Sequence, residues 1–174
     1  MDRLDAVRAA VAGFDPHSAR ERESRRRFLA ELRRLDDPFD QGADPVHVTG
    51  SAIVVGPRGT VLHLHKRLGR WMQPGGHLDA GEWPADAALR EAVEETGLAV
   101  RHPRGGARLV HLDVHPAARG HVHLDLRYLL EAPDEDPVPA PGESPEVRWF
   151  GWDEALAVAD EALIDGLRRV RPAG

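Results

Sequence analysis

Residues 76–98 read GHLDAGEWPADAALREAVEETGL, and the rest of the chain is organised around this segment. Pro84 suits the first position of a helix, because the N–H that proline lacks has no helical partner there. Good helix formers follow it, and Gly97 is typical of the residue at which a helix ends. The segment therefore predicts a helix over residues 84–96 that stops at the glycine.

Acidic residues gather on one face of this predicted helix. At about 100° per residue, Glu91, Glu94 and Glu95 fall within an arc of roughly 100°. Carboxylates at this spacing repel one another, and a hard divalent cation with oxygen ligands, such as Mg²⁺, relieves the repulsion. The opposite side carries a stripe that we expect to face the core, made of Ala85, Leu89, Ala92, Val93 and Thr96.

Three features near this acidic face favour a metal site over a solvated surface. Glu82 lies just before the helix, where it adds another carboxylate. Gly75 and Gly76 allow a close approach of the backbone, so that a main-chain carbonyl can join the site. Arg90 precedes Glu94 by four residues and can pair with it and orient it. A surface without a ligand leaves all three features unexplained.

At these positions the sequence resembles the signature of the Nudix hydrolase family. That signature reads G, five residues, E, seven residues, R-E-U-x-E-E-x-G-U, where U is a bulky aliphatic residue. Every charged and glycine position matches, and the one departure is Ala92, which is small for U. The matching residues are Gly76, Glu82, Arg90, Glu91, Glu94, Glu95, Gly97 and Leu98. The resemblance implies an α/β/α sandwich with a mixed sheet.

The resemblance also implies a reaction and roles for these residues. It implies metal-dependent hydrolysis, with Mg²⁺ or Mn²⁺, of a pyrophosphate bond in a nucleoside diphosphate linked to another moiety. The ligands would be Glu94 and Glu95, with the Gly75 or Gly76 carbonyl, and Glu91 would be a ligand or the base. Glu82 and Arg90 would support and orient that set.

Members of the family differ over which glutamate is the general base. Some recruit an acid from the loop before the last strand, where Glu143 is our first candidate and Glu146 our second. The substrate classes left open are nucleotide sugars, ADP-ribose and modified nucleoside triphosphates. A catalytically silent nucleotide sensor on the same fold is the alternative, although such proteins typically lose signature glutamates and none is missing here. Isomerases of this fold resemble one another in a catalytic cysteine that this chain lacks.

Length and composition indicate one ordinary globular domain with a short extension. The chain has 174 residues, of which 41% are hydrophobic and 30% charged. We expect the Nudix hydrolase domain over residues 44–174 and an N-terminal helical extension over residues 1–43. Within the extension, one amphipathic helix ends near Gly13, and a second begins with Asp15 and Pro16 as N-cap and first residue and runs to about Leu35. This helical pair packs on the core or forms a homodimer interface.

Charge and cysteine content narrow the partners. The net charge of −6 provides no basic field to recruit nucleic acid or an anionic membrane. The absence of cysteine excludes disulfides, thiolate zinc sites and a cysteine nucleophile. The N-terminus is interrupted by charge too often for a secretion signal, and no apolar run of about 18 residues exists. We therefore expect a cytoplasmic protein with a small nucleotide-type substrate and no membrane partner.

The remaining pattern predicts strands on both sides of the acidic helix, which suits a mixed sheet in an α/β layer. The Pro-rich and Gly-rich segments between them, residues 56–59, 67–74 and 132–145, are expected to be turns and loops. A helix is expected over residues 152–159, with residues 160–170 continuing or restarting it. The expected strands are residues 46–55, 61–66, 98–102, 109–115, 121–130 and 146–150.

Histidines and acids alternate along several of these strands, so each strand carries its set on one face. If the strands are neighbours, these sets form one polar face of the sheet. The face comprises His63, His65, His111, Asp113, His115, His121, His123, Asp125 and Arg127. Its H-x-H pairs can ligate zinc or another transition metal, and the face can also contact the substrate or be a plain polar surface with satisfied core histidines. The candidate substrate contacts are Arg67, Arg70, Trp71, His77 and Arg127.

Overall fold

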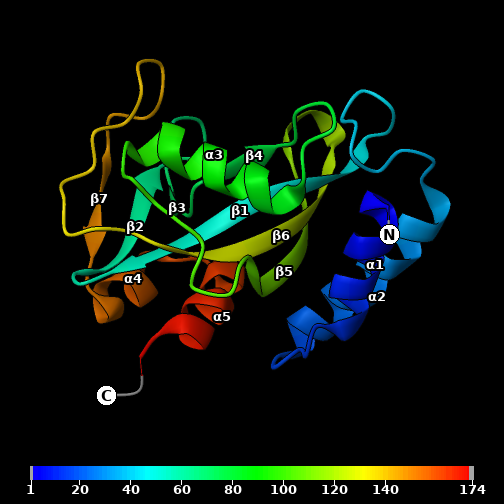
Figure 1. The fold of residues 1–174 in the computed structure, drawn as a ribbon, viewed down its shortest axis with the longest axis horizontal. Helices are drawn as coiled ribbons and strands as arrows, with labels where there is room; N and C mark the ends of the chain where they lie inside the picture. The colour runs from blue at the N-terminus through cyan, green and yellow to red at the C-terminus, as the bar shows by residue number, and fades with distance from the viewer. Residues whose placement is uncertain (1, 173–174) are drawn as a thin grey trace.

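The computed structural model describes residues 2–172, which form a mixed β-sheet between helices (Figure 1). The strand order is β3-β2-β1-β6-β5, while β4 pairs with β1 and β7 pairs with β2 beside this path. β1 and β6 are parallel, and the other pairs are antiparallel. The strands are β1 (Val46–Gly56), β2 (Gly59–Leu64), β3 (Trp71–Met72), β4 (Gly75–His77), β5 (Arg108–Pro116), β6 (Val122–Glu131) and β7 (Val147–Phe150).

Helices flank the sheet on both faces and at one edge (Figure 1). α3 (Pro84–Thr96) covers one face, α4 (Trp152–Val158) and α5 (Glu161–Val170) lie on the other, and α1 (Arg3–Gly13) and α2 (Ala19–Arg34) lie beside β5. This arrangement confirms the predicted α/β sandwich with a mixed sheet and N-terminal helices. Within the described residues, no helix is both long enough and apolar enough to cross a membrane.

α3 packs unusually close to the sheet because small residues face each other across the interface. Gly50 of β1 lies under the start of the helix, and a Cβ there would collide with the Pro84 carbonyl oxygen. Ala87, Ala88 and Ala92 are fully buried on the facing side of the helix. The predicted stripe was therefore wrong about Val93, which is 44% exposed, because the alanines give the closer contact with β1.

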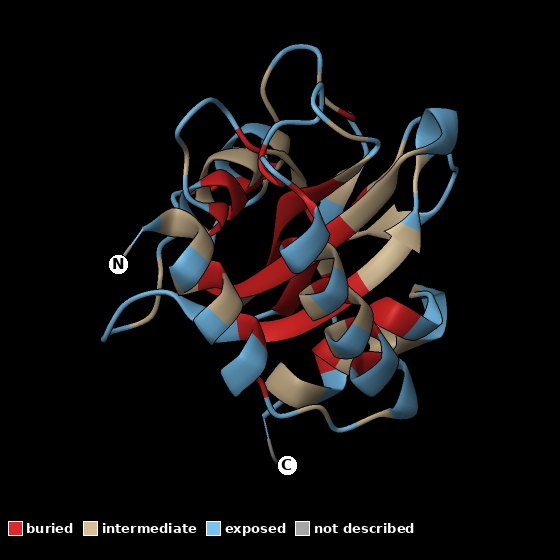
Figure 2. Cartoon of the chain, turned by 90° about the vertical axis from the view of Figure 1, so that its right-hand side faces the viewer, coloured by how far each residue is buried: buried red, intermediate tan, exposed pale blue. Residues whose placement is uncertain are grey.

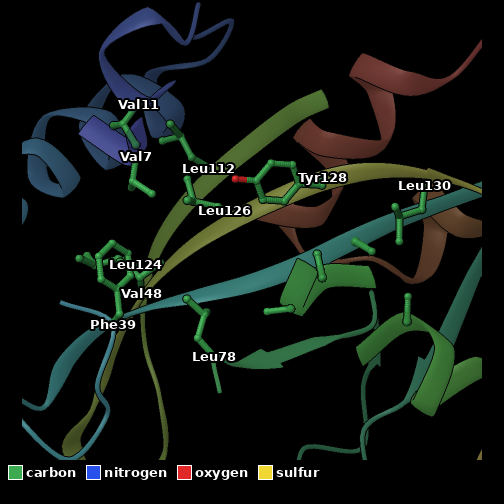
Figure 3. Packing of buried hydrophobic residues seen from close by; sticks show 14 of the residues in the cluster. Val7, Val11, Phe39, Val48, Leu78, Leu112, Leu124, Leu126, Tyr128 and Leu130 are labelled. Carbon is green, nitrogen blue, oxygen red and sulfur yellow. The ribbon is translucent and has the colours of Figure 1, made fainter. Parts of the chain in front are cut away.

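Each face of the sheet has its own apolar core, since side chains alternate along the central strands. Val48, Ala52 and Val54 of β1 belong to the core that α3 covers, whereas Ile53 packs with Leu163 of α5. Figure 2 shows the central strands as the most buried part of the molecule. Figure 3 shows the larger core, in which Val7 and Val11 of α1 lie near strand residues that include Leu112, Leu124 and Leu126.

One predicted strand is absent, and one predicted loop contains a strand. Residues 98–102 form no strand, and only a single bridge joins Arg101 to Glu131 of β6. Pro103 follows two residues later, and it cannot extend the ladder because proline has no N–H to donate. Within the predicted loop 67–74, β3 pairs Trp71 with Leu64, because this loop folds back along β2.

The starts of two helices are set by side-chain caps. α2 begins after Ser18, and the expected start at Asp15 and Pro16 was wrong. The Ser18 hydroxyl accepts a hydrogen bond from the Glu21 N–H at 3.0 Å, while the Glu21 carboxylate accepts the His17 N–H at 2.6 Å. Asp160 caps α5 in the same way through the Leu163 N–H at 2.9 Å, so residues 161–170 form a separate helix.

The N-terminal helices pack on the core through buried polar contacts as well as apolar ones. Arg20 of α2 donates two hydrogen bonds to Asp113 of β5, at 3.0 and 3.2 Å. Glu21 is 1% exposed and accepts a hydrogen bond from Arg169 of α5 at 2.8 Å. The helical pair thus ties an edge of the sheet to the C-terminal helix, while its use as a dimer interface stays a prediction.

We predict that Arg169→Met destabilises the fold, because it leaves the buried Glu21 carboxylate without its cationic partner. The loss in free energy of unfolding should be about 3–5 kcal/mol, as for other buried ion pairs that lose one partner. Urea unfolding at neutral pH measures it. The control is Arg168→Met, since Arg168 is exposed on the same helix and its loss should change stability by less than about 0.5 kcal/mol. Equal effects of the two substitutions would contradict the role of this ion pair.

Candidate active site

The candidate site lies where α3 meets β4, and glycines create the room for it. The Gly75 N–H donates a hydrogen bond to the Glu95 carboxylate at 2.9 Å. A Cβ on Gly76 would lie 2.5 Å from Glu91 Oε1, so only glycine leaves space for that carboxylate. The helix ends at Gly97, whose φ of 68° is the left-handed conformation that glycine adopts without strain. The double glycine thus allows the predicted close approach of the backbone, and the helix has the predicted ends. The role of a glycine carbonyl as a ligand stays a prediction.

Arg90 is the cation around which the glutamates are arranged. Its guanidinium donates to both oxygens of Glu82, at 2.9 and 3.0 Å, in the bidentate geometry that orients a carboxylate. It also donates to Glu91 at 2.9 Å, to Glu94 at 3.2 Å and to the His77 carbonyl at 2.9 Å. One positive charge is therefore shared among three carboxylates.

Glu95 and Glu91, the two carboxylates next to the β4 glycines, resist ionisation. Burial raises the pKa of Glu95 to about 8, against a hydrogen bond from Gly75 that lowers it, and the charges of Glu91, Glu143 and Glu94 raise it further. Burial also raises the pKa of Glu91, although Arg90 opposes this shift. By contrast, the hydrogen bonds of Arg90 overcome burial at Glu82 and lower its pKa. The carboxylates closest to β4 are thus those whose negative charge is least compensated.

The Pro-rich loop before β7 brings Glu143 to this group. The loop lies along the end of α3, where the Val138 N–H donates to the Thr96 carbonyl at 2.8 Å and the Ala140 N–H donates to the Glu94 carbonyl at 2.9 Å. Glu143 is then close enough for its charge to raise the pKa values of two of the buried glutamates. Glu146 is exposed, and its carbonyl accepts the Leu64 N–H at 2.8 Å.

A pocket of about 690 Å³ opens beside the glutamates on the polar face of the sheet. Gly75 and Gly76 form the boundary between the two, because they line the pocket and also contact Glu95 and Glu91. The pocket floor includes Asp125, which accepts hydrogen bonds from Ser51 at 2.6 Å and from Thr49 at 3.0 Å.

The structure brings two of the five predicted substrate contacts to this pocket, namely Arg67 and His77. Arg70 is exposed and does not line it. Trp71 packs against Phe150, with ring centroids 4.8 Å apart. Arg127 is buried away from the pocket, where it donates to Asp125 at 2.9 Å and lies near Asp113.

The predicted polar face exists on β5 and β6, but the prediction was wrong for His63 of β2. The register of β2 places His63 on the opposite face with Val61, where its Nδ1 lies 3.6 Å from Glu95 Oε1. His111 and Asp113 are buried beneath α2 and α5, whereas His63, His65, His115, His121 and His123 line the pocket. Burial lowers the pKa of His63 to about 4 and that of His123 to about 3, so both rings are neutral at pH 7. Residues of one alternating sequence pattern thus lie partly in the core and partly in the pocket.

Sequence reasoning missed His47, which is buried on β1 next to the pocket histidines. Its ring centroid lies 5.1 Å from those of His77, His121 and His123. The signal was present, because His47, Thr49 and Ser51 alternate along the strand and continue the polar face. The apolar residues in the second half of β1 made this alternation easy to miss.

Comparison with known proteins identifies the family. The sequence profile described as the NUDIX domain matches residues 45–170. The chain belongs to the Nudix family. The bis(5'-nucleosyl)-tetraphosphatase [asymmetrical] of Rattus norvegicus is 33% identical over 105 residues, which are 57% of this chain and 67% of that protein.

Solved structures of Nudix proteins share the fold. A Nudix-family hydrolase from Clostridium perfringens is 26% identical with a TM-score of 0.61, and the match covers 72% of this chain and 98% of that one. A MutT Nudix hydrolase from Burkholderia pseudomallei is 28% identical with a TM-score of 0.58, covering 71% of this chain and 97% of that one. These relatives make the chain an enzyme of the Nudix pyrophosphohydrolase type, a family that generally uses divalent metals.

We predict that the metal-free protein loses stability as the pH rises from about 4.5 to about 8. The pKa of Glu95 is about 8 in the folded protein and has an ordinary value of 4.5, so the folded state binds more protons than the unfolded chain in this window. The stability is therefore fully present below the ordinary pKa and is lost as the pH approaches the raised one. The loss should amount to roughly a few kcal/mol.

Urea unfolding in the presence of a chelator measures this effect, and the difference between wild type and Glu95→Gln isolates it. The comparison is needed because the histidines have lowered pKa values, which act in the opposite direction. Parallel pH profiles for the two proteins would show that Glu95 titrates normally. Glu161→Gln, an exposed change on α5, should reproduce the wild-type profile.

Proposed function

We propose that this chain is a divalent-metal-dependent hydrolase that cleaves a pyrophosphate bond in a nucleoside diphosphate linked to another moiety. The observation that carries the proposal is the burial of Glu91 and Glu95 against the β4 glycines, with more negative charge than Arg90 can balance. A cation at this position would relieve the raised pKa values of both groups.

The available donors fit a hard cation. They are carboxylate oxygens together with the backbone carbonyls of the double glycine, and Mg²⁺ or Mn²⁺ prefers such ligands. Glu91, Glu94, Glu95 and Gly76 would hold the ion. Since Arg90 binds Glu91 and Glu94 in the described structure, these two carboxylates would partly exchange Arg90 for the ion. When bound, the cation neutralises phosphate charge and lowers the pKa of a water molecule.

The surrounding residues position the reaction. Arg90 holds Glu82 through two hydrogen bonds and the β4 backbone through the His77 carbonyl, so it fixes the helix relative to the strand. Glu143 is the candidate base that takes the proton of the attacking water, because its loop places it near the buried glutamates. Arg67 lines the pocket and is available to a phosphate group of the substrate.

The proposal also covers the group that is linked to the nucleoside diphosphate in the substrate. Nucleotide sugars, ADP-ribose and modified nucleoside triphosphates share the required bond. The name of the rat relative, a bis(5'-nucleosyl)-tetraphosphatase, supports adding dinucleoside polyphosphates to this class. A pocket of about 690 Å³ next to the glutamates suits a nucleotide portion that extends from the diphosphate.

The alternative is a silent sensor that binds a nucleotide without cleaving it. The intact set of signature carboxylates favours the enzyme, because a sensor has no need for buried glutamates that oppose folding. A panel of nucleotide sugars, ADP-ribose, dinucleoside polyphosphates, oxidised nucleoside triphosphates and capped RNA, each with Mg²⁺ or Mn²⁺, separates the two. Tight binding of one compound without cleavage of any would establish the sensor.

We predict that Glu95→Gln lowers kcat on the cleaved substrate by at least about a hundredfold while the protein remains folded. The amide keeps the shape of the side chain but removes the charge that would hold the cation. Initial rates with saturating metal measure the loss, and circular dichroism monitors the fold. Glu161→Gln serves as the control and should keep wild-type kcat. Near wild-type hydrolysis by the Glu95 variant would disprove the assignment of the site.

We predict that Glu143→Gln lowers kcat by about 10²–10⁴-fold, whereas Glu146→Gln has a much smaller effect. Of these two residues, Glu143 is the one near enough to raise the pKa values of Glu91 and Glu95. The pH dependence of kcat distinguishes a base from a structural residue, because loss of the base should remove the acidic limb of the profile. A larger effect at Glu146 would reverse the order of the two candidates.

A further inference from the structure

We propose that His47, His77 and His123 form a second metal site, which binds one transition-metal ion of the zinc type through three imidazole nitrogens. One ligand nitrogen from each ring lies within 4.8 Å of the others. In the part of the chain that the structure describes, these are the residues that form such a three-donor group, and the signature glutamates do not. The site is distinct in chemistry from the carboxylate centre, because its donors are nitrogens.

The three histidines lie on neighbouring strands, which fixes their separation. His47 of β1 is directly paired with His123 of the parallel strand β6. His77 of β4 is paired with Thr49, two residues along β1 from His47 and on the same face. The ring centroids of all three pairs are 5.1 Å apart. The backbone ladder therefore holds the donors close together without help from an ion.

His47 provides an independent indication of a ligand. Its Nδ1 lies 3.3 Å from the Asp44 carbonyl oxygen, an acceptor that keeps the proton on Nδ1 and leaves the lone pair on Nε2. The residue is 1% exposed, and its Nε2 has no hydrogen-bond partner among the described residues. A buried acceptor without a partner is costly, and metal-bound histidines typically have this outer contact to a carbonyl.

The other two ligands connect the site to solvent. His77 and His123 both line the pocket, whereas His47 lies behind them. An ion held by these three rings would have its remaining coordination position toward the pocket. Three protein ligands with one open position are the arrangement of zinc sites that exchange ligands, whereas closed structural sites use four.

The chemistry of the donors determines the choice of ion. Neutral imidazoles suit Zn²⁺, Co²⁺, Ni²⁺ and Cu²⁺, whereas Mg²⁺ and Mn²⁺ prefer oxygen ligands. The two kinds of site can therefore be filled separately in one protein. A transition-metal ion would also add positive charge to a pocket in which the His63 and His123 rings are neutral. If the proposed function holds, this charge would attract an anionic substrate, but metal binding itself does not depend on that function.

Calorimetric titration with Zn²⁺ in excess Mg²⁺ tests the proposal, because Mg²⁺ would occupy the proposed carboxylate site. We expect one Zn²⁺ per chain with a Kd in the micromolar range or below. His47→Gln, His77→Gln and His123→Gln should each weaken binding by at least about tenfold. His17→Gln and Glu95→Gln should leave it unchanged, because His17 is exposed in the loop before α2 and Glu95 belongs to the other centre. Circular dichroism of the metal-free variants confirms that each remains folded.

Co²⁺ provides a second measurement that is independent of activity. Bound to three imidazoles, it should give visible absorption bands that Zn²⁺ abolishes and Mg²⁺ does not. His77 is only partly buried, so its variant keeps the test valid if the change at His47 prevents folding. Zn²⁺ binding that persists in all three histidine variants, or that is lost in Glu95→Gln, would overturn the proposal. Absence of binding tighter than millimolar would overturn it as well.

Discussion

The site depends on the close approach of α3 to the backbone of β1 and β4. Gly50 lets the helix start lie on β1, and Gly76 lets the Glu91 carboxylate lie against β4. This contact excludes water from Glu91 and Glu95 and raises their pKa values. A larger residue at either glycine would separate the helix from the sheet. The small residues that allow the tight interface therefore also place the Glu91 and Glu95 carboxylates where burial disfavours their ionised form.

Arg90 keeps this arrangement folded without neutralising it. It donates two hydrogen bonds to Glu82, which lower the pKa of that carboxylate, and one each to Glu91 and Glu94. Among the described residues, Glu95 accepts one hydrogen bond, from the Gly75 N–H, and the His63 ring lies 3.6 Å away. Negative charge is thus better balanced at Glu82 than at Glu95. This difference is consistent with the proposed cation site, because a cation could balance the charge that Arg90 does not reach.

Much of this could be predicted from the sequence where the cause is local. The helix over residues 84–96 could be predicted because Pro84 marks its start and Gly97 its end, and both signals lie within the segment itself. Residues 98–102 have the apolar composition of a strand, yet they lack a partner beyond one bridge to Glu131. The start of α2 likewise depended on the competition between two possible caps, which the geometry of Ser18 and Glu21 decides. The residues of a segment alone do not determine whether a strand finds a partner, or which of two possible caps starts a helix.

The polar face of the sheet shows the same limit at the level of function. Period two places His111 with Asp113 on one face of β5 and His123 with Asp125 on one face of β6, and the pairing of the two strands joins these sets. Their environments differ because other parts of the chain cover that face unevenly. α2 covers Asp113 and supplies Arg20, whereas His123 lies open to a pocket and beside His47. An alternating sequence thus determines which side chains of one strand share a face. The helices that pack on that face determine which of these side chains are buried in the core and which remain accessible to a ligand.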